Sequence, residues 1–374
     1  MANIYLDYAA TSRKHFDIIE KNLNILKEIY ANPSSGHTLG KKNEKLFRTA
    51  RERIAKSICA RPEEIIFTSG GTESNNTVFN HVLNRFDSGE IIISSIEHPS
   101  VKSSAKHLEK HGFIVHELSV DKAGIIDLEE LKQKINGKTV LISIMLANNE
   151  TGMINPLKEI SEIIKNKNIL LHSDIVQAFG KVEIDVSDLN LDFASVSAHK
   201  IGALNNFGFL YAKNGEIEPF ILGGGQERGL RSGTSDLLGI LVLADCVDET
   251  LESISKLREL KNYFLDKLEE NQIDFEINGL KNNSLPNIMN IYFKKIESQR
   301  LITYLDALAI YISGGSACSS GNIKSSRIIT EMYDIERASH SVRISIGFDI
   351  TKEDLDFVID KIVRLENRLK ERDN

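Results

Sequence analysis

Lys200 and Asp174 are the residues whose types and positions point most directly to chemistry. Lys200 ends the segment SVSAHK, directly after the apolar run LDFA, beside a histidine and two serines. A lysine at a strand end in that company can form an imine with an aldehyde cofactor. Asp174 ends the apolar strand within LHSDIVQA, and Gln177 follows three residues later. Pyridoxal phosphate requires a lysine that binds its aldehyde covalently and an acid that keeps its ring nitrogen protonated.

Both residues also have purely structural explanations. Lys200 is of a type that commonly lies solvated on a protein surface. Asp174 is of a type that commonly caps a following helix. Evidence from other segments of the chain must therefore decide between a cofactor site and these structural roles.

The segment IIFTSGGTESNN contains a glycine-rich turn that could bind phosphate. It places Gly71 and Thr72 between a strand and a helix that we expect to begin near Glu73. Backbone amides at such a helix start, helped by the helix dipole and by the Thr72 hydroxyl, form a phosphate cradle. Glycine also serves any tight strand-to-helix turn, so this segment alone leaves both interpretations open.

Three more polar residues are candidates for contacts with a ring or a substrate. His98 follows the run IIISSIE, where it could stack on the ring and carry protons, or be a loop residue with its hydrogen bonds satisfied. Arg343 lies within the strand-like SVRISIG, where a charge needs a ligand or an acid partner. It is a candidate for gripping a substrate carboxylate in a bidentate fork. Asn149 of ANNETG could donate to the same carboxylate or simply form a turn.

Cys318 lies in ISGGSACSSGN, a stretch dominated by glycine, serine and alanine. That composition predicts a mobile loop that carries a reactive thiol. The alternative is a free cysteine that acts as a small hydrophobic residue, which is what we expect of Cys59 and Cys246. The three cysteines are widely spaced and odd in number, so neither a disulfide framework nor a metal site is expected.

The composition favours small-molecule chemistry. The 374 residues include 46 Lys and Arg against 53 Asp and Glu, a formal net charge of -7. This balance argues against direct nucleic-acid binding or a membrane surface. The N-terminus lacks the apolar core of a secretory signal, and no run of about 18 apolar residues occurs. We therefore expect a soluble, cytoplasmic protein.

Strand-like and helix-like segments alternate over the first two thirds of the chain. Several strand-like runs are continuously apolar, which is typical of central strands covered on both faces. The fold class is therefore α/β, with a mostly parallel central sheet. The runs expected to form it are 64–69, 90–95, 112–120, 138–146, 168–174, 191–197 and 207–213.

A long amphipathic helix is predicted over 237–271 as a spine between two domains. Residues 14–252 are expected to form a large cofactor-binding domain. Residues 1–13 and 253–374 are expected to form a smaller α/β domain, which carries the cysteine loop at about 312–327.

Taken in order, these segments closely resemble those of cysteine desulfurases, in the class V aminotransferase family of pyridoxal-phosphate enzymes. The resemblance covers nearly the whole chain and implies a fold-type I architecture with a large and a small domain. The segments that carry it are YLDYAAT, NPSSGH, FTSGGTESNN, EHPSV, NNETG, SDIVQAFGK, SAHKIG, GGGQERGLRSGT, GGSACSSG and RISIG.

The resemblance implies a role for each candidate residue. Lys200 would hold the cofactor as a Schiff base, with Asp174 at the pyridine nitrogen, Gln177 at the ring hydroxyl and His98 stacked on the ring. Thr234 of RSGT would reach in from a second subunit, which implies a homodimer with shared active sites. The residues expected around the phosphate are Gly71, Thr72, Ser197, His199 and that Thr234.

The resemblance also implies the reaction. L-cysteine would yield L-alanine, Lys200 and His98 would carry protons, and Cys318 as a thiolate would take the sulfur as a persulfide. The long, serine-rich form of the cysteine loop is the one that delivers sulfur directly to partner proteins. The expected acceptors are an iron-sulfur scaffold or a relay for tRNA thiolation.

One segment departs from the family pattern. Where the family usually has GPKG soon after the lysine, this chain has Ala203, Leu204, Asn205 and Asn206. Asparagine tolerates a left-handed backbone, so Asn206 is expected to stand in for glycine.

Rival functions remain on the sequence alone. A selenocysteine lyase or a small-substrate aminotransferase would need the same lysine and aspartate. A catalytically silent binding or scaffold subunit would be a protein of a different class.

Overall fold

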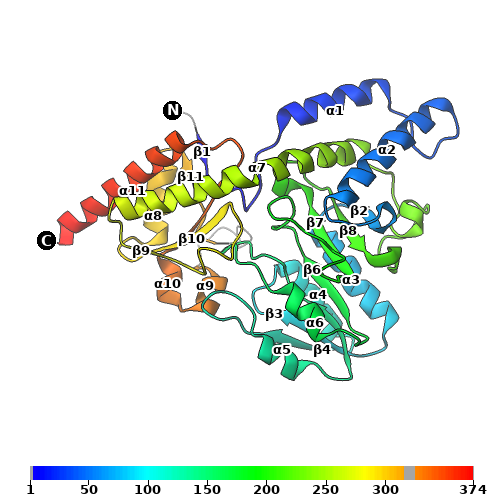
Figure 1. Ribbon diagram of the computed structural model, residues 1–374, viewed down its shortest axis with the longest axis horizontal. Coiled ribbons are helices and arrows are strands. Elements are labelled where there is room, and N and C mark those ends of the chain that lie inside the picture. Colours follow the sequence, from blue (N-terminus) through cyan, green and yellow to red (C-terminus); the bar gives the residue numbers. More distant parts are fainter. Residues whose placement is uncertain (1–2, 316–324, 374) are drawn as a thin grey trace.

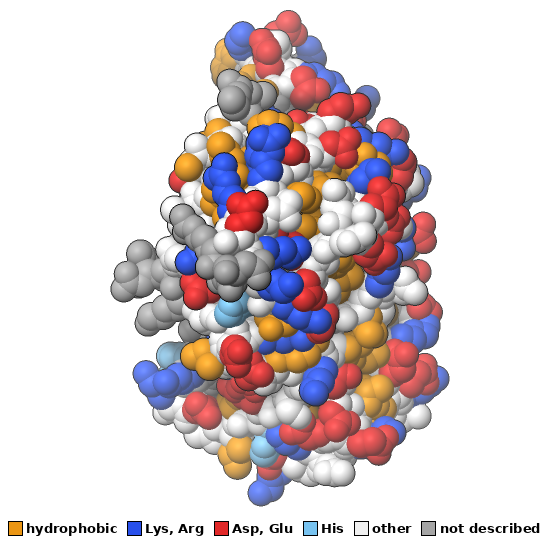
Figure 2. Space-filling view, turned by 90° about the vertical axis from the view of Figure 1, so that its left-hand side faces the viewer, with side chains coloured by type: hydrophobic (Ala, Val, Ile, Leu, Met, Phe, Trp, Pro, Cys, Tyr) orange, Lys and Arg blue, Asp and Glu red, His pale blue; other side chains and the backbone are white. Residues whose placement is uncertain are grey.

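The structure, a computed structural model, describes residues 3–315 and 325–373. Cys318 lies outside the described residues. Within the described residues, no helix is long and apolar enough to cross a membrane. On the face shown in Figure 2, basic and acidic side chains lie next to one another rather than in separate fields.

A seven-stranded sheet forms the centre of the larger part of the molecule (Figure 1). Its strand order is β2-β8-β7-β6-β5-β3-β4, and only β8 runs antiparallel to its neighbours. All seven runs predicted as strands form this sheet, so the mostly parallel α/β class is confirmed. The strands are β2 (Ile65–Thr68), β3 (Glu90–Ser94), β4 (Ile114–Leu118), β5 (Thr139–Ser143), β6 (Leu170–Asp174), β7 (Phe193–Ser197) and β8 (Gly208–Ala212).

Both faces of the sheet are buried, which explains why its strands are continuously apolar. Along β3, Ile92 belongs to one hydrophobic core, whereas Ile91 and Ile93 belong to another on the opposite face. Helices cover the two faces, as Figure 1 shows. They include α2 (Thr38–Lys56), α3 (Gly71–Arg85), α4 (Pro99–Glu109), α5 (Leu128–Lys134) and α6 (Leu157–Ile163). Helix α1 (Phe16–Glu28) packs instead on α7 (Leu237–Glu270).

The C-terminal part has its own core and two small sheets. One is antiparallel with the order β12-β10-β9, and the other pairs β1 with β11 in parallel. The strands are β1 (Ile4–Tyr5), β9 (Phe275–Ile277), β10 (Ile288–Phe293), β11 (Ile310–Tyr311) and β12 (Ser341–Ser345). The helices are α8 (Ser298–Asp306), α9 (Arg327–Met332), α10 (Ile335–Ser339) and α11 (Lys352–Asp373).

Helix α7 (Leu237–Glu270) confirms the long helix predicted over 237–271. Its first half, including Ile240 and Val247, packs into the core of the large sheet. Its second half, including Leu257 and Phe264, packs into the C-terminal core. The exact division into domains at residues 13 and 252 stays a prediction.

The sheet topology explains where polar side chains can meet. Strands β2, β3, β5, β6 and β7 all point the same way, because β8 is antiparallel to both β2 and β7. Their carboxyl ends therefore lie along one edge of the sheet, which is where ligands bind in open α/β folds.

Candidate active site

A cavity of about 660 Å³ opens at this carboxyl edge. Its walls come from the N-terminal segment, from the turns after five of the strands, and from β12. Of the sequence-predicted site residues that the structure describes, all except Thr234 line it. They are Gly71, Thr72, His98, Asn149, Asp174, Gln177, Ser197, His199, Lys200 and Arg343.

Lys200 is half-buried and hydrogen-bonded to the backbone rather than simply solvated on the surface. It lies in the short 3-10 helix η2 (Ala198–Ile201) that follows β7. Its Nζ donates to the backbone carbonyls of Ala9 and Ala10, at 2.7 Å each. Its own carbonyl accepts from Ser12 Oγ at 2.7 Å and from Lys181 Nζ at 3.0 Å. Both ends of the residue are therefore fixed beside the cavity.

Asp174 and His98 are joined by a buried hydrogen-bond network. Asn75 Nδ2 donates to Asp174 Oδ2 at 2.9 Å and to Ser100 Oγ at 2.8 Å. Ser100 Oγ in turn lies 2.8 Å from His98 Nδ1. Asp174 Oδ1 also accepts from the Val176 amide at 3.0 Å, so it partly plays the local capping role considered as its alternative.

Burial controls the charge of the two histidines at the site. Burial lowers the pKa of His98, and the nearby Asp174 only partly offsets this. The pKa of His199 falls to about 3, first because of burial and then because of the positive charge on Lys200. His199 Nδ1 lies 3.1 Å from Thr11 Oγ1. Both imidazoles are therefore expected to be neutral at pH 7, available to stack or to accept a proton.

The glycine turn leaves room that a side chain would fill. Gly70 has φ of +133°, and a Cβ built on it would lie 3.3 Å from Ser197 Oγ. A Cβ on Gly71 would lie 2.8 Å from Val176 Cγ2, closer than real Cβ atoms come. Helix α3 begins at Gly71, two residues earlier than expected, so Thr72 lies in its first turn. An anion in this space would meet the amides of a helix start.

Gln177, which also lines the cavity, has a side-chain oxygen without a hydrogen-bond partner among the described residues. Its Nε2 donates to the carbonyl of Ala9 at 3.0 Å. Its Oε1 is buried and has no hydrogen-bond partner among the described residues. A hydroxyl group on a bound ring would satisfy it. The lysine amine, the buried acid, the orphan acceptor and the glycine cradle together fit pyridoxal phosphate.

Arg343 does have the acid partner that its strand position requires. Its side chain is 1% exposed, and Nη2 donates to Asp7 Oδ1 at 2.6 Å. Nη1 donates to the Asn149 carbonyl at 3.0 Å, and Nε is buried with no hydrogen-bond partner in the part of the chain that the structure describes. Arg343 and the Asn149 side chain both line the cavity. A substrate carboxylate would therefore share this guanidinium with Asp7.

The segment that departs from the family pattern adopts the expected backbone. Asn206 has φ of +53°, the left-handed conformation for which glycine is usually required. Lys14 supports the loop by donating to the Ala203 carbonyl at 2.7 Å and to Asn205 Oδ1 at 2.8 Å. Asn205 and Asn206 both line the cavity.

Three other residues singled out from the sequence lie outside the cavity: Thr234, Cys246 and Cys59. Thr234 is exposed in the loop before α7 and is not among the described residues that line the cavity. Cys246 is buried in α7, and burial raises the pKa of its thiol to about 12. It is a small buried residue, as expected. For Cys59 the same expectation is wrong, because it is exposed in a turn after α2 with φ of +57°.

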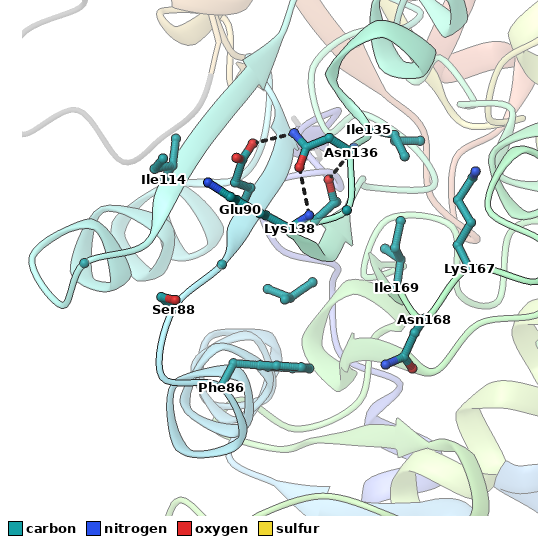
Figure 3. Close-up of a pocket in the computed structure, with 15 residues that line it drawn as sticks. Phe86, Ser88, Glu90, Ile114, Ile135, Asn136, Lys138, Lys167, Asn168 and Ile169 are labelled. Carbon is teal, nitrogen blue, oxygen red and sulfur yellow. Dashed lines mark hydrogen bonds between the residues drawn. The ribbon is translucent and has the colours of Figure 1, made fainter.

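A second hollow, of about 790 Å³, lies at the opposite edge of the sheet (Figure 3). It is formed at the amino ends of β3, β4, β5 and β6, and apolar side chains such as Phe86 and Ile114 line much of it. Its buried acid is already satisfied, since Glu90 Oε2 accepts from His116 Nε2 at 2.7 Å and from Asn136 Nδ2 at 2.8 Å. None of the predicted site residues that the structure describes lies there.

Several residues that complete the site were not found from the sequence. Asn75 could have been, because it lies one helical turn after Gly71 and so faces the same side of α3. Asp7 gives no comparable signal, because its partner Arg343 is 336 positions away. The backbone carbonyls of Ala9 and Ala10 give none at all.

Known proteins are similar in sequence to this chain over nearly its whole length. The aminotransferase class-V family profile matches residues 4–358. A cysteine desulfurase IscS of Dictyoglomus turgidum is 39% identical, over 98% of this chain and 95% of the relative. A putative cysteine desulfurase IscS 1 of Bacillus subtilis is 37% identical, over 99% of this chain and 100% of the relative.

Solved structures agree with these relatives. A NifS-like protein superimposes with a TM-score of 0.89 at 34% identity, covering 97% of this chain and 99% of the other. SspA, solved in complex with cysteine, superimposes with a TM-score of 0.82 at 32% identity, covering 92% and 98%.

Proposed function

The chain belongs to the class V aminotransferase family and is a pyridoxal-phosphate-dependent cysteine desulfurase, and from this premise we propose which residues carry each part of the reaction. Its fold is that of the fold-type I enzymes. The observation that carries the assignment is the cavity that Lys200 shares with Asp174, His98 and the glycine turn.

Lys200 is the covalent anchor of the cofactor, and Asp174 holds the proton on its ring nitrogen. When bound, pyridoxal phosphate supplies an aldehyde that links to the substrate amine and a cationic ring that stabilises negative charge at the α-carbon. Gln177 Oε1 would accept from the ring hydroxyl, and His98 would stack on the ring. Gly71, Thr72, Ser197 and His199 bind the phosphate.

Arg343 and Asn149 hold the carboxylate of L-cysteine. Support comes from the buried guanidinium, whose Nε has no partner among the described residues, and from the bound cysteine in the related SspA structure. The Lys200 amine would accept the α-proton of the substrate. His98, kept neutral by burial, is a second proton acceptor.

Cys318 is the sulfur acceptor. Its thiolate bonds to the substrate sulfur, the Cβ–S bond breaks, and the remaining three carbons leave as alanine after protonation. Described residues on both sides of it are tied to the cavity walls. Before it, the Ser313 and Arg343 backbones exchange hydrogen bonds of 3.2 and 2.6 Å. After it, Arg327 donates to the carbonyls of Ser95 and Glu97, directly before His98.

The persulfide goes to an iron-sulfur scaffold or to a relay for tRNA thiolation, and the enzyme acts in the cytoplasm as a homodimer. Thr234 completes the phosphate site of the partner subunit. Its exposure, and its position outside the cavity of its own chain, support a contact made in trans. The large domain, 14–252, carries the cofactor, and the small domain carries the cysteine loop.

The decisive experiment is to incubate the purified enzyme with L-cysteine and to map by mass spectrometry which thiol gains a sulfur atom. We expect the label on Cys318 alone, with Cys59 and Cys246 unmodified. Cys318→Ala should lose sulfide release while keeping the absorbance of the Lys200–cofactor linkage. Wild-type sulfide release by Cys318→Ala would overturn the assignment of the nucleophile, and intact linkage absorbance in Lys200→Ala would overturn the anchor.

A further inference from the structure

A buried lysine, Lys181, contacts the backbone of Lys200. Lys181 is 4% exposed and belongs to the turn after β6, the turn that also carries Gln177. Its Nζ donates to the Lys200 carbonyl at 3.0 Å. Within the described residues it forms no ion pair. Burying a lysine without an acid partner is costly, so a residue needed only to fill space would be apolar.

The groups that face Lys181 come from several elements. A small cavity of about 30 Å³ brings it together with Tyr8 and His15 from the N-terminal segment, with Lys200 from η2, and with Glu249 from α7. Burial, and then the positive charge on Lys200, lower the pKa of Lys181 to about 7. The repulsion is mutual, because it depends on both charges.

We propose that Lys181 is a positioning residue for Lys200: it fixes the backbone of Lys200 through the carbonyl, and its charge opposes a second positive charge on the Lys200 side chain. This inference rests on the proposed role of Lys200 as the cofactor anchor. The hydrogen bond orients the turn from which the Lys200 amine projects. The charge keeps that amine, and its linkage to the cofactor, from holding a proton too tightly.

The chain offers a matched control in Lys261. This lysine is also buried, at 5% exposure, and also donates to a backbone carbonyl, that of Leu285 at 2.9 Å. Its other acceptor is Ser284 Oγ at 2.7 Å, and burial lowers its pKa to about 8. It packs in the second half of α7 and does not line the active-site cavity. Lys261→Met therefore reproduces the loss of a buried lysine without touching Lys200.

The test is a pH titration of the absorbance of the Lys200–cofactor linkage, together with the thermal unfolding of each variant without cofactor. Lys181→Met should raise the linkage pKa by about one unit, since it removes a nearby positive charge. Lys181→Arg is charged at every pH of the titration, so its linkage pKa should equal that of wild type or lie below it. Lys261→Met should lower the melting temperature but leave the linkage pKa unchanged.

An unchanged linkage pKa in Lys181→Met would overturn the electrostatic role. Should that variant not fold, Lys181→Gln gives the same test, because it removes the charge and keeps a buried donor. Equal pKa changes in Lys181→Met and Lys261→Met would show a general structural effect and would overturn the inference. If the wild-type enzyme forms no linkage that Lys200→Ala abolishes, the proposed anchor fails, and this inference fails with it.

Discussion

The glycine turn gives the sharpest test of how the cofactor is bound. Gly71→Ala would place a Cβ 2.8 Å from Val176 Cγ2 and 3.7 Å from Ser197 Cβ. Only the first contact is too close, so the clash is with one methyl group. Forcing an extra methyl into a packed site typically costs about 1–3 kcal/mol. Since the turn and Val176 both line the cavity, we expect this cost to appear as cofactor affinity weakened about 5- to 150-fold.

The assay is a double-mutant cycle on the dissociation constant of pyridoxal phosphate, measured with enzyme freed of cofactor. Gly71→Ala alone should bind weakly. Adding Val176→Ala removes the clashing methyl and should recover most of the affinity, which gives a coupling energy of about 1 kcal/mol or more. The single Val176→Ala variant measures what the valine itself contributes. Gly36→Ala is the control, because a Cβ there meets nothing within 4 Å.

The outcome that refutes this reasoning is simple to recognise. If the double variant binds the cofactor as weakly as Gly71→Ala alone, the methyl contact is not the cause of the loss. The glycine would then be required for some other reason, and the cavity walls would not be arranged as described.

Three further predictions follow from contacts at the site. Asp7→Asn removes the negative charge that pairs with the buried Arg343. We expect the free energy of unfolding to fall by about 2 kcal/mol, which would lower the melting temperature by about 3 °C. An unchanged melting temperature would contradict the pairing. Burial raises the pKa of Glu97 from 4.5 to about 8, so between those values the unfolded chain releases a proton that the folded one keeps, and stability falls as pH rises. Glu97→Gln should therefore raise the melting temperature more at pH 8 than at pH 5, and an equal change at both would count against a neutral carboxyl. Mixing inactive Lys200→Ala and Thr234→Ala subunits should restore activity. If the threonine acts in trans, each hybrid dimer has one complete site, with Lys200 from one subunit and Thr234 from the other. No recovery of activity would place the threonine in cis or outside the site.

The sheet was predictable from the sequence because its strands are buried on both faces. A strand such as β3, with isoleucines that face opposite cores, has to be apolar at every position, and such a run is easily seen. The parallel order then places the residues after each strand along one edge. For this reason Lys200, Asp174 and His98 could be assigned to one site from the sequence, and they do line one cavity.

The supporting residues were not predictable in the same way. The spacing from Gly71 could place Asn75 on the cavity side of α3, but its partners Asp174 and Ser100 are 99 and 25 positions away. Nothing local to Asn75 indicates either partner. Cys59 was misjudged because it lies three residues beyond the end of α2, in a turn where its backbone has φ of +57°. Pairings of this kind are decided by tertiary contacts, which the periodicity of a single segment does not contain.

The N-terminal segment contributes to the site through its backbone, and side-chain patterns in the sequence do not reveal such contacts. The carbonyl of Ala9 accepts from both Gln177 Nε2 and Lys200 Nζ. Any residue type offers that carbonyl, so no sequence pattern marks it. The same segment is held in the C-terminal part of the molecule, where Asp7 bridges to Ser345 and pairs with Arg343. One short N-terminal segment therefore contacts both the lysine turn and Arg343, and so links the two parts of the cavity wall.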